Sequence, residues 1–432
     1  MTPDRLRAYV VLDQDEDLSR CCAVADESEA CEAVLHYLRA CTPLEPQSAV
    51  RAVPSRRSRT DAAQPIPGAT IVVLDATRAD YERLRGLVGH TPQIRDVGID
   101  LPLLPARHWC PGRSPRPSFG DRSAAERLIR AEALRSEGVG DGAPAVRVAI
   151  FDAGLATGTT GPGAVWPVPK AGEAPSEIRG GHGMATARQI LALAPHAELY
   201  DYRILPERIS DPDSFVSDAI AAYEHLNDRI ATSQGPWVVV NAWSVFDRTI
   251  DPGRGANSEI ARLYSEVATA ARAGADVVFA AGNCGQFCPD PRCAKNSRGP
   301  GASILGVNAL PDALCVGAVR CDGAWMGYSS QGPGLGAAEG SRTKPDLCAP
   351  SGFREDDDAA TINTGTSTAC GLAAGVIAAL RREFPKPTPD EMRAALVDTA
   401  RSDTGGWSPR LGHGILDAAA ARKALQARFG AA

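Results

Sequence analysis

The sequence predicts an α/β fold in which a doubly wound, mostly parallel sheet carries helices on both faces. From residue 123 onward, short apolar runs of strand length alternate with longer stretches of helical length, which is the pattern of a parallel sheet. Aromatic residues make up only 5% of the chain, which suits a large α/β core with short turns. The strands are expected at 146–151, 197–203, 236–241, 276–281 and 313–319, and the helices at 183–194, 214–228, 258–273, 366–382 and 388–400.

A smaller α+β domain is predicted ahead of this sheet. Its elements follow the order β-α-β-β-α-β of a ferredoxin-like split unit. Its strands are expected at 6–12, 48–53, 69–74 and 94–99, and its helices at 28–41 and 78–87. A stretch rich in Pro, Gly and Arg follows, which indicates an extended linker. The predicted division is an N-terminal domain at 1–104, a linker at 105–121 and a main domain at 122–432.

The first helix of the main domain has a sequence signature of its own. Ser123 precedes the helical stretch 124–135, and Glu126 follows three residues later. This spacing predicts a capping box with Ser123 as the N-cap.

Length and charge limit the classes of function. A chain of 432 residues has room for two or three domains, and a net charge of −6 is too mild to predict a nucleic-acid partner. The first twenty residues hold no apolar signal region, and no apolar run approaches a membrane span. We therefore expect no membrane association and a cytoplasmic location, with the twelve cysteines reduced.

Four polar residues stand at the ends or starts of predicted elements. Asp152 follows the apolar strand predicted at 146–151. Asn283 follows the strand predicted at 276–281, with Gly282 between. His182 lies among glycines where a helix begins, and Ser367 opens an Ala/Gly-rich helix after a Gly-Thr turn. Each has an ordinary structural reading when taken alone, such as a turn residue, a buried histidine or a helix cap. Open α/β sheets keep their chemistry at the carboxyl ends of strands, which favours a functional reading of the set.

The residue types fit acyl transfer. A serine hydroxyl becomes a good nucleophile only when a base takes its proton, and His182 is the candidate base for Ser367. Asp152 would orient the imidazole and stabilise its charged form. The side-chain amide of Asn283 and the backbone N–H of Ser367 would hold the negative charge that develops on the carbonyl oxygen.

These segments resemble the motifs of the subtilisin family of serine peptidases. Asp152-Ala153-Gly154 is similar to the family's Asp-Thr/Ser-Gly, and Gly181-His182-Gly183 with Met184 to Ala187 is similar to its His-Gly-Thr-His-Val-Ala-Gly. Residues 239–244 resemble Val-Ile-Asn-Met-Ser, and residues 412–418 resemble the closing Gly-x-Gly-x-Leu/Val-Asp-Ala. The order Asp, His, Ser is also that of the family. The resemblance spans roughly residues 125–425.

The resemblance implies a subtilisin-like fold and a serine endopeptidase that cleaves peptide or protein substrates through an acyl-enzyme intermediate, without a cofactor. It also implies that the N-terminal domain is similar to a propeptide, which acts as an intramolecular inhibitor and chaperone. The substrate-binding residues that it implies are Asn241, Ser244, Val245, Ala281 and Gly282. The chain departs from the family pattern at Ala185, Val245, Thr368 and Gly371, none of which is a reacting group.

Two other classes of function stay open from the sequence. One is a catalytically silent binding or regulatory module with the subtilisin fold, although all four reacting positions are filled. The other is a nucleotide-binding α/β protein, for which residues 152–158 offer only a poor match to Gly-x-Gly-x-x-Gly.

Three cysteines and an acidic run have no settled role in this interpretation. Cys284, Cys288 and Cys293 follow Asn283 with a spacing that is not that of a standard zinc site. Metal ligands, a disulfide and free thiols are all open, with free thiols favoured, and a structural calcium or zinc ion remains an alternative. The acidic run 355–358 is expected to be a solvated loop, or else an attractor of basic substrate residues or calcium.

Overall fold

A computed structural model of the chain describes residues 5–13, 38, 49–54, 69–101, 104–105, 119–134, 145–156, 158–160, 165–167, 181–205, 215–244, 246, 261–335, 343–356, 362–403 and 405–430. The chain forms two compact units. The first unit comprises Met1–Pro102, Phe215–Arg229 and Ile250–Glu266, and the second comprises Leu103–Ser214, Ile230–Thr249 and Val267–Ala432. No helix among the described residues is long and apolar enough to cross a membrane.

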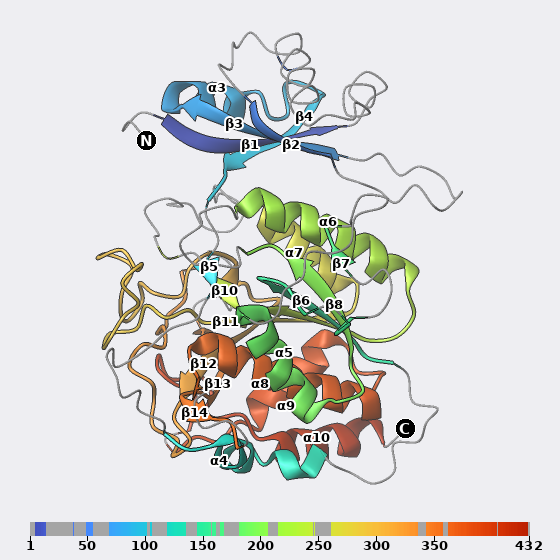
Figure 1. Cartoon of the computed structure of the whole chain (residues 1–432), viewed down its shortest axis with the longest axis vertical. Coiled ribbons are helices and arrows are strands. Elements are labelled where there is room, and N and C mark those ends of the chain that lie inside the picture. Colours follow the sequence, from blue (N-terminus) through green and yellow to red (C-terminus); the bar gives the residue numbers. More distant parts are fainter. Residues whose placement is uncertain are drawn as a thin grey trace. The chain divides into compact units, whose positions relative to one another are not determined.

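The first unit contains an antiparallel sheet of four strands in the order β2-β3-β1-β4 (Figure 1). The strands are β1 (Arg5–Asp13), β2 (Ala49–Pro54), β3 (Ala69–Thr77) and β4 (Ile94–Ile99), and helix α3 (Arg78–Gly86) joins the last two. This arrangement is that of the predicted split unit. Of the predicted helix at 28–41, only residue 38 is described, and it is helical. Consecutive apolar residues of β1 (8–12) and of β3 (71–74) are fully buried, so both faces of these two central strands are shielded from solvent.

Residues 215–229 belong to this unit. The first of them contact Asp100, which directly follows β4, and Arg7 of β1. The amide N–H of Ser217 donates to Asp100 Oδ1 at 2.8 Å, and Arg7 Nε donates to Asp100 Oδ2 at 2.7 Å. The Arg7 guanidinium also lies 3.7 Å from the centre of the Phe215 ring. Burial raises the pKa of Asp100 in spite of these partners. Helix α6 (Val216–Thr232) begins at this point.

The second unit is built on a seven-stranded sheet in the order β13-β12-β11-β9-β6-β8-β7, in which every pair of neighbours is parallel. The strands are β6 (Arg147–Asp152), β7 (Val165–Trp166), β8 (Glu198–Arg203), β9 (Trp237–Asn241), β11 (Ala275–Ala280), β12 (Leu314–Val319) and β13 (Leu347–Pro350). The five predicted strands are all present, and β7 and β13 were not predicted. The predicted α/β fold class is confirmed.

Three helices lie between consecutive strands of this sheet: α5 (His182–Leu193), α6 and α7 (Ala261–Arg272). Most of α6 and the first half of α7 fall in the residues of the first unit. The other helices are α4 (Arg122–Leu128), η1 (Ala131–Leu134), η3 (Gly306–Ala309), α8 (Thr366–Glu383), α9 (Pro389–Asp398) and α10 (Ala418–Phe429). The predicted cap of α4 is wrong: Asp121, not Ser123, is the N-cap, because its side chain accepts the N–H of Ala124. Ser123 instead donates its hydroxyl to Asp356 at 2.7 Å. The helix at the C-terminus, α10, was not predicted.

The order of the strands reverses at β6. The chain passes from β6 to β8 on one side of it and then returns to β9 on the other side. Ligands of open α/β sheets bind at such a switch point, outside the carboxyl ends of the strands. The carboxyl end of β6 is Asp152.

Helices α5 and α8 pack against each other closely and run parallel. A Cβ on Gly371 would lie 3.2 Å from the carbonyl oxygen of Thr186, and a Cβ on Gly375 would lie 3.1 Å from Cα of Ile190. The second contact lies one helical turn after the first on both helices. The two helices therefore run in the same direction, and the same face of each stays in contact with the other. One turn before Thr186 is His182, and one turn before Gly371 is Ser367.

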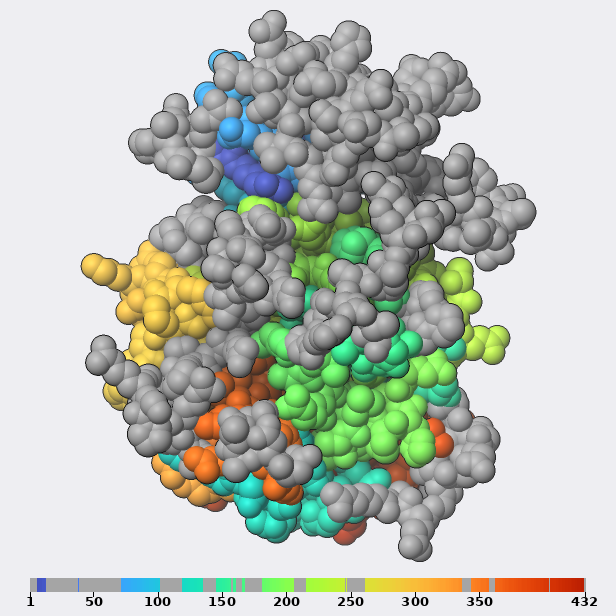
Figure 2. All heavy atoms as spheres, in the orientation of Figure 1, coloured from blue at the N-terminus to red at the C-terminus, as the bar shows by residue number. Residues whose placement is uncertain are grey.

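A polar network connects α4 and the segment before α8 with helix α5. Arg122 of α4 donates to both oxygens of Glu355 at 2.5 and 2.7 Å and to Gln189 of α5 at 2.9 Å. Gln189 donates to Asn363 Oδ1 at 2.7 Å, and Asn363 donates back to Glu355 at 2.7 Å. Asn363 lies on β15 (Ile362–Asn363), which pairs with β14 (Phe353–Arg354). Figure 2 shows the green surface of α5 beside the orange surface of the segment before α8.

This network corrects the interpretation of the acidic run. Glu355 is only 6% exposed, and Asp356 is bound to α4. Burial opposes ionisation of Glu355, but its hydrogen bonds to Arg122 outweigh this and lower its pKa. The expectation of a solvated loop is therefore wrong for Glu355, whereas Asp356 is exposed, and residues 357–358 lie outside the described residues.

Candidate active site

Asp152 is fully buried at the end of β6 and accepts hydrogen bonds on both oxygens. Its Oδ1 accepts the N–H of Ala153 at 2.7 Å and lies 2.7 Å from Nδ1 of His182. Its Oδ2 accepts the hydroxyl of Thr186 at 3.0 Å. A carboxylate that is this well hydrogen-bonded fixes the position of its partners, and an imidazole Nδ1–H facing it leaves Nε2 as the acceptor.

The backbone around His182 explains this close contact. His182 is the first residue of α5, so its ring lies at the end of the helix rather than along its side. A Cβ on Gly183 would lie 2.3 Å from the carbonyl oxygen of Gly154. Only glycine therefore lets the first turn of α5 approach the turn that follows Asp152. His182 is 6% exposed, and its Nε2 atom has no hydrogen-bond partner among the described residues.

Ser367 is the second residue of α8 and is 3% exposed. Its hydroxyl points back to the carbonyl oxygen of Thr364 at a long 3.5 Å. Gly365 caps the helix with a φ of 87°, a left-handed conformation that favours glycine. The register of α5 and α8 brings the N-terminal ends of the two helices together, but no hydrogen bond joins Ser367 to His182 in this structure. The N-terminal end of α8 carries the positive end of the helix dipole.

Asn283 follows β11 after Gly282 and is fully buried. Its Oδ1 accepts the backbone N–H of Thr366 at 3.0 Å and the hydroxyl of Thr366 at 2.9 Å. Since a backbone N–H only donates, the oxygen of the carboxamide faces α8 and its NH₂ group faces the other way. The carboxamide donor is thereby oriented by the residue that precedes Ser367.

The predicted substrate-binding residues have different surroundings. Asn241, on β9, is fully buried, and its Nδ2 donates to the carbonyl oxygen of Val278 at 3.4 Å. Ala281 is also fully buried, in a cluster with Ile304, Ala309 and Cys315. Gly282 has a φ of 97°, and a Cβ there would lie 3.0 Å from Ser330 Oγ and 3.2 Å from Ser244 Oγ. Val245 lies outside the described residues.

Ser244 belongs to a short strand that another part of the same unit already covers. Strand β10 (Trp243–Ser244) pairs antiparallel with β5 (Leu104–Pro105), in the register Trp243 to Pro105 and Ser244 to Leu104. The start of the predicted linker is therefore an added β-strand on the strand that we expect to bind substrate.

The cysteines form a disulfide between Cys284 and Cys293, with Cα atoms 5.7 Å apart, while Cys288 is an exposed free thiol. The expectation of free thiols is therefore wrong for two of the three cysteines, and neither of these two can act as a thiolate ligand. The described residues contain no group of three or more His, Cys, Asp or Glu side chains that could hold a metal ion. Burial raises the pKa of three other thiols, those of Cys315, Cys348 and Cys370.

Two residues with a role in this geometry were not predicted. Thr186 binds the Asp152 carboxylate and Thr366 binds the Asn283 carboxamide. The position of Thr186, one helical turn after His182, could have predicted its role, since residues four apart lie on the same face of a helix. Thr366 lies directly before Ser367, but nothing in the sequence alone joins it to a residue 83 positions away.

The fold and the arrangement of these groups define the class as a subtilisin-like serine hydrolase. The chain belongs to the subtilase family, whose model matches residues 164–414. It is therefore a subtilisin-like serine endopeptidase that acts on peptides or proteins. The match begins after Asp152, so the position of that residue rests on the structure.

Comparison with individual proteins gives the same family. Mycosin-1 of Mycolicibacterium smegmatis is 27% identical over 369 residues, which cover 76% of this chain and 78% of that protein. Mycosin-1 of Mycobacterium tuberculosis is 31% identical over 159 residues, or 34% of this chain and 36% of the relative. The crystal structure of fervidolysin from Fervidobacterium pennivorans, a keratinolytic enzyme related to subtilisin, superimposes with a TM-score of 0.57 at 16% identity. That match covers 98% of this chain but 62% of fervidolysin, so the chain spans less than two thirds of its length and shares the fold.

Proposed function

We propose that Asp152, His182 and Ser367 are the catalytic triad of this endopeptidase and that Asn283 completes its oxyanion hole. The observation that carries the proposal is the contact of 2.7 Å between the His182 ring and the buried Asp152 carboxylate, at the switch point of the sheet. The in-register packing of α5 and α8 supports the inclusion of Ser367.

The mechanism follows from these groups. His182 Nε2 takes the proton of Ser367 as its hydroxyl attacks the peptide carbonyl, and Asp152 stabilises the imidazolium that results. The negative charge on the carbonyl oxygen is held by the amide N–H of Asn283, by the backbone N–H of Ser367 and by the dipole of α8. The imidazolium then protonates the leaving amine, and water repeats the cycle on the acyl-enzyme.

The test is hydrolysis of an unstructured protein such as casein by the purified chain. Wild-type protein should cleave it, and Ser367→Ala should not. A wild-type chain that stays folded, binds peptides and cleaves none would instead support the catalytically silent module. Thr368→Ser, at the next position of the same helix, is the matched control and should remain active.

We further propose that the N-terminal region is an intramolecular inhibitor and folding aid. The support for this is the pairing of β5 with β10, since a substrate backbone would need the same strand edge. Mass spectrometry of the purified chain should show a cut in residues 105–121 in the wild type and an intact chain in Ser367→Ala. Equal processing of both proteins, or a wild-type chain that is active while intact, would contradict the proposal.

Cofactor and location remain expectations from the sequence. The chemistry proposed here needs no cofactor, because the His182 side chain accepts and donates every proton that is transferred. We keep the cytoplasmic location as a prediction, and the Cys284–Cys293 disulfide weakens the part of it that assumed reduced cysteines. Fractionation of cells followed by thiol counting on the recovered protein would test both.

A further inference from the structure

The disulfide closes a short loop directly after the proposed oxyanion donor. Cys284 is the residue next to Asn283, and its partner Cys293 lies nine positions further along the chain. Both half-cystines are 2% exposed and pack against Phe246, which follows β10. We call residues 284–293 the disulfide loop.

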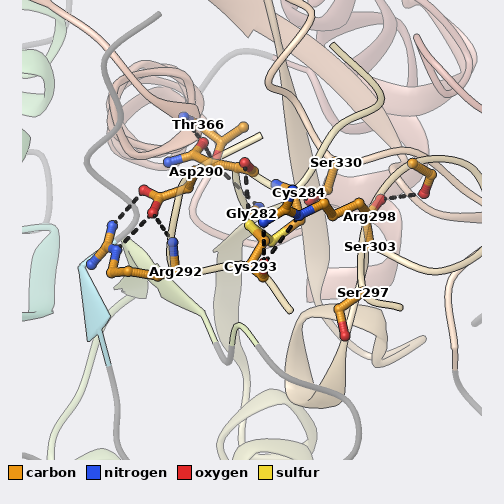
Figure 3. Close-up of a disulfide and its surroundings, with 12 residues drawn as sticks. Gly282, Cys284, Asp290, Arg292, Cys293, Ser297, Arg298, Ser303, Ser330 and Thr366 are labelled. Carbon is orange, nitrogen blue, oxygen red and sulfur yellow. Dashed lines mark hydrogen bonds and ion pairs between the residues drawn. A yellow bond between two sulfur atoms is a disulfide. The ribbon is translucent and has the colours of Figure 1, made fainter. Parts of the chain in front are cut away.

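The disulfide loop holds the main chain of Asn283 from one side. The carbonyl oxygen of Asn283 accepts the N–H of Asp290 at 2.9 Å, and Sγ of Cys293 lies 3.6 Å from the same oxygen. Figure 3 shows Asp290 to one side of the disulfide between Cys284 and Cys293. The loop thus folds back over the peptide group that follows Asn283.

The two ends of the loop are anchored to the body of the second unit. The carbonyl oxygen of Cys293 accepts two hydrogen bonds from Arg298, at 3.0 and 2.7 Å. The N–H of Cys284 donates to Ser330 Oγ at 3.0 Å, and its carbonyl oxygen accepts the N–H of Gly299 at 2.8 Å. The disulfide joins these two anchored points into one ring (Figure 3).

Asn283 is consequently held at both ends, by the disulfide loop at its main-chain carbonyl and by Thr366 at its carboxamide. A change in the main-chain position of Asn283 would move the amide donor away from the substrate oxygen. A donor in an oxyanion hole acts only within hydrogen-bond distance, and a misplacement of about 1 Å at an active site can cost about a hundredfold in rate.

Overall stability is a weaker explanation of the bond. The entropy that a disulfide removes from the unfolded chain grows with the length of the loop that it closes, and this loop is short. The bond also lies next to a proposed catalytic group rather than between distant elements.

We propose that the Cys284–Cys293 disulfide is a positioning element of the oxyanion hole, which fixes the main chain of Asn283 so that its amide meets the developing charge. This inference rests on the proposed function. Opening the bond should lower kcat by about tenfold to a hundredfold while KM changes little, because the donor acts in the transition state.

The test compares Cys284→Ser/Cys293→Ser with the matched control Cys288→Ser, which removes the exposed free thiol of the same loop and leaves the bond intact. The double variant should lose kcat as stated, and Cys288→Ser should retain it. The same pair of changes made in an Asn283→Ala background should lower kcat by less than about twofold, because the donor that the bond positions is already absent.

Reduction of the bond in folded Cys288→Ser protein is the second arm, and it applies if the double variant does not fold. Dithiothreitol, a dithiol, supplies two electrons and two protons, so that Cys284 and Cys293 become thiols while the reagent becomes its cyclic disulfide. Thiol counting confirms the opening, and circular dichroism confirms the fold. The loss of kcat should match that of the double variant.

Three results would overturn the proposal: full kcat with the bond open, an equal loss in the Asn283→Ala background, or general unfolding on reduction. Failure of the proposed function looks different, because then the wild-type chain hydrolyses no peptide with the bond closed.

Discussion

The two halves of the proposed active site are built in different ways. In the Asp152–His182 half, two side chains meet directly, and the carboxylate is buried and accepts hydrogen bonds on both oxygens. In the Ser367–Asn283 half, the side chains do not meet, and each is placed by the backbone at the start of α8 or the end of β11. The proposed acid–base pair is thus fixed by direct side-chain contacts, whereas the positions of the proposed nucleophile and oxyanion donor depend on how turns and loops are held.

The largest effect is expected from removing the nucleophile itself. Ser367→Ala should lower kcat by about a million-fold, as loss of a nucleophile that acts within a triad does. Steady-state hydrolysis of a peptide amide, with active-site titration to correct for contaminating protease, measures it. A loss of only about tenfold would mean that the second half does not supply the nucleophile.

The Asp152–His182 half can be broken with little change in shape. Asp152→Asn should lower kcat by about ten-thousandfold, because an amide can donate to Nδ1 and stabilise the wrong tautomer. Thr186→Val, which removes one of the hydrogen bonds to the same carboxylate, is the matched control with a much smaller loss. Near-equal effects of the two changes would show that the charge of Asp152 is not what matters.

The oxyanion donor should have an intermediate effect. Asn283→Ala should lower kcat by about a hundredfold or more at nearly unchanged KM, since the bond that it supplies forms in the transition state. Thr366→Val should cost less, because the backbone N–H of Thr366 continues to orient the carboxamide. An Asn283→Ala variant whose loss appears only in KM would assign this residue to ground-state binding.

The smallest effect is expected from a change in the polar network that connects the two halves, and it concerns the stability of the fold. The Arg122–Glu355 network links Gln189, on the helix of His182, with Asn363, on the strand before Ser367. Because the folded-state pKa of Glu355 is lowered, its ionised form stabilises the fold, fully so above the unfolded value of 4.5. This contribution is lost as the pH falls from there through the folded-state pKa.

Glu355→Gln should therefore lower the unfolding temperature at pH 7 and flatten its decline below pH 4.5. Scanning calorimetry from pH 3 to pH 7 measures both, with Asp356→Asn as the control on the exposed neighbour. If Glu355→Gln keeps the full acid sensitivity of the wild type, the sensitivity arises elsewhere.

The sequence predicted the part of the molecule that is governed by local pattern. Four of the five predicted strands are largely apolar runs, whereas β8 carries charged residues at 198, 201 and 203, and the limits of all five fall within a residue of the observed ones. Because parallel strands end at one edge, Asp152 and Asn283 could be placed on that edge before the structure was known. The contact between Asp152 and His182 then follows from the close approach that Gly183 permits.

What the sequence missed depends on contacts between distant residues. The burial of Glu355 requires Arg122, which lies 233 positions earlier, and an acidic run without its partner reads as solvated. The spacing of Cys284, Cys288 and Cys293 does not choose a pair, since the choice depends on how the loop turns. The pairing of β5 with β10 joins segments more than a hundred residues apart and has no short-range signal.

The most direct measurement of the central claim is covalent labelling with a fluorophosphonate, followed by mass spectrometry of the peptides. Such a reagent reacts with a serine only where a base activates it and an oxyanion site receives the charge. We predict a single adduct on Ser367, absent from Ser367→Ala and greatly slowed in His182→Ala. An adduct on another serine, or labelling of Ser367 that is independent of His182, would contradict the account.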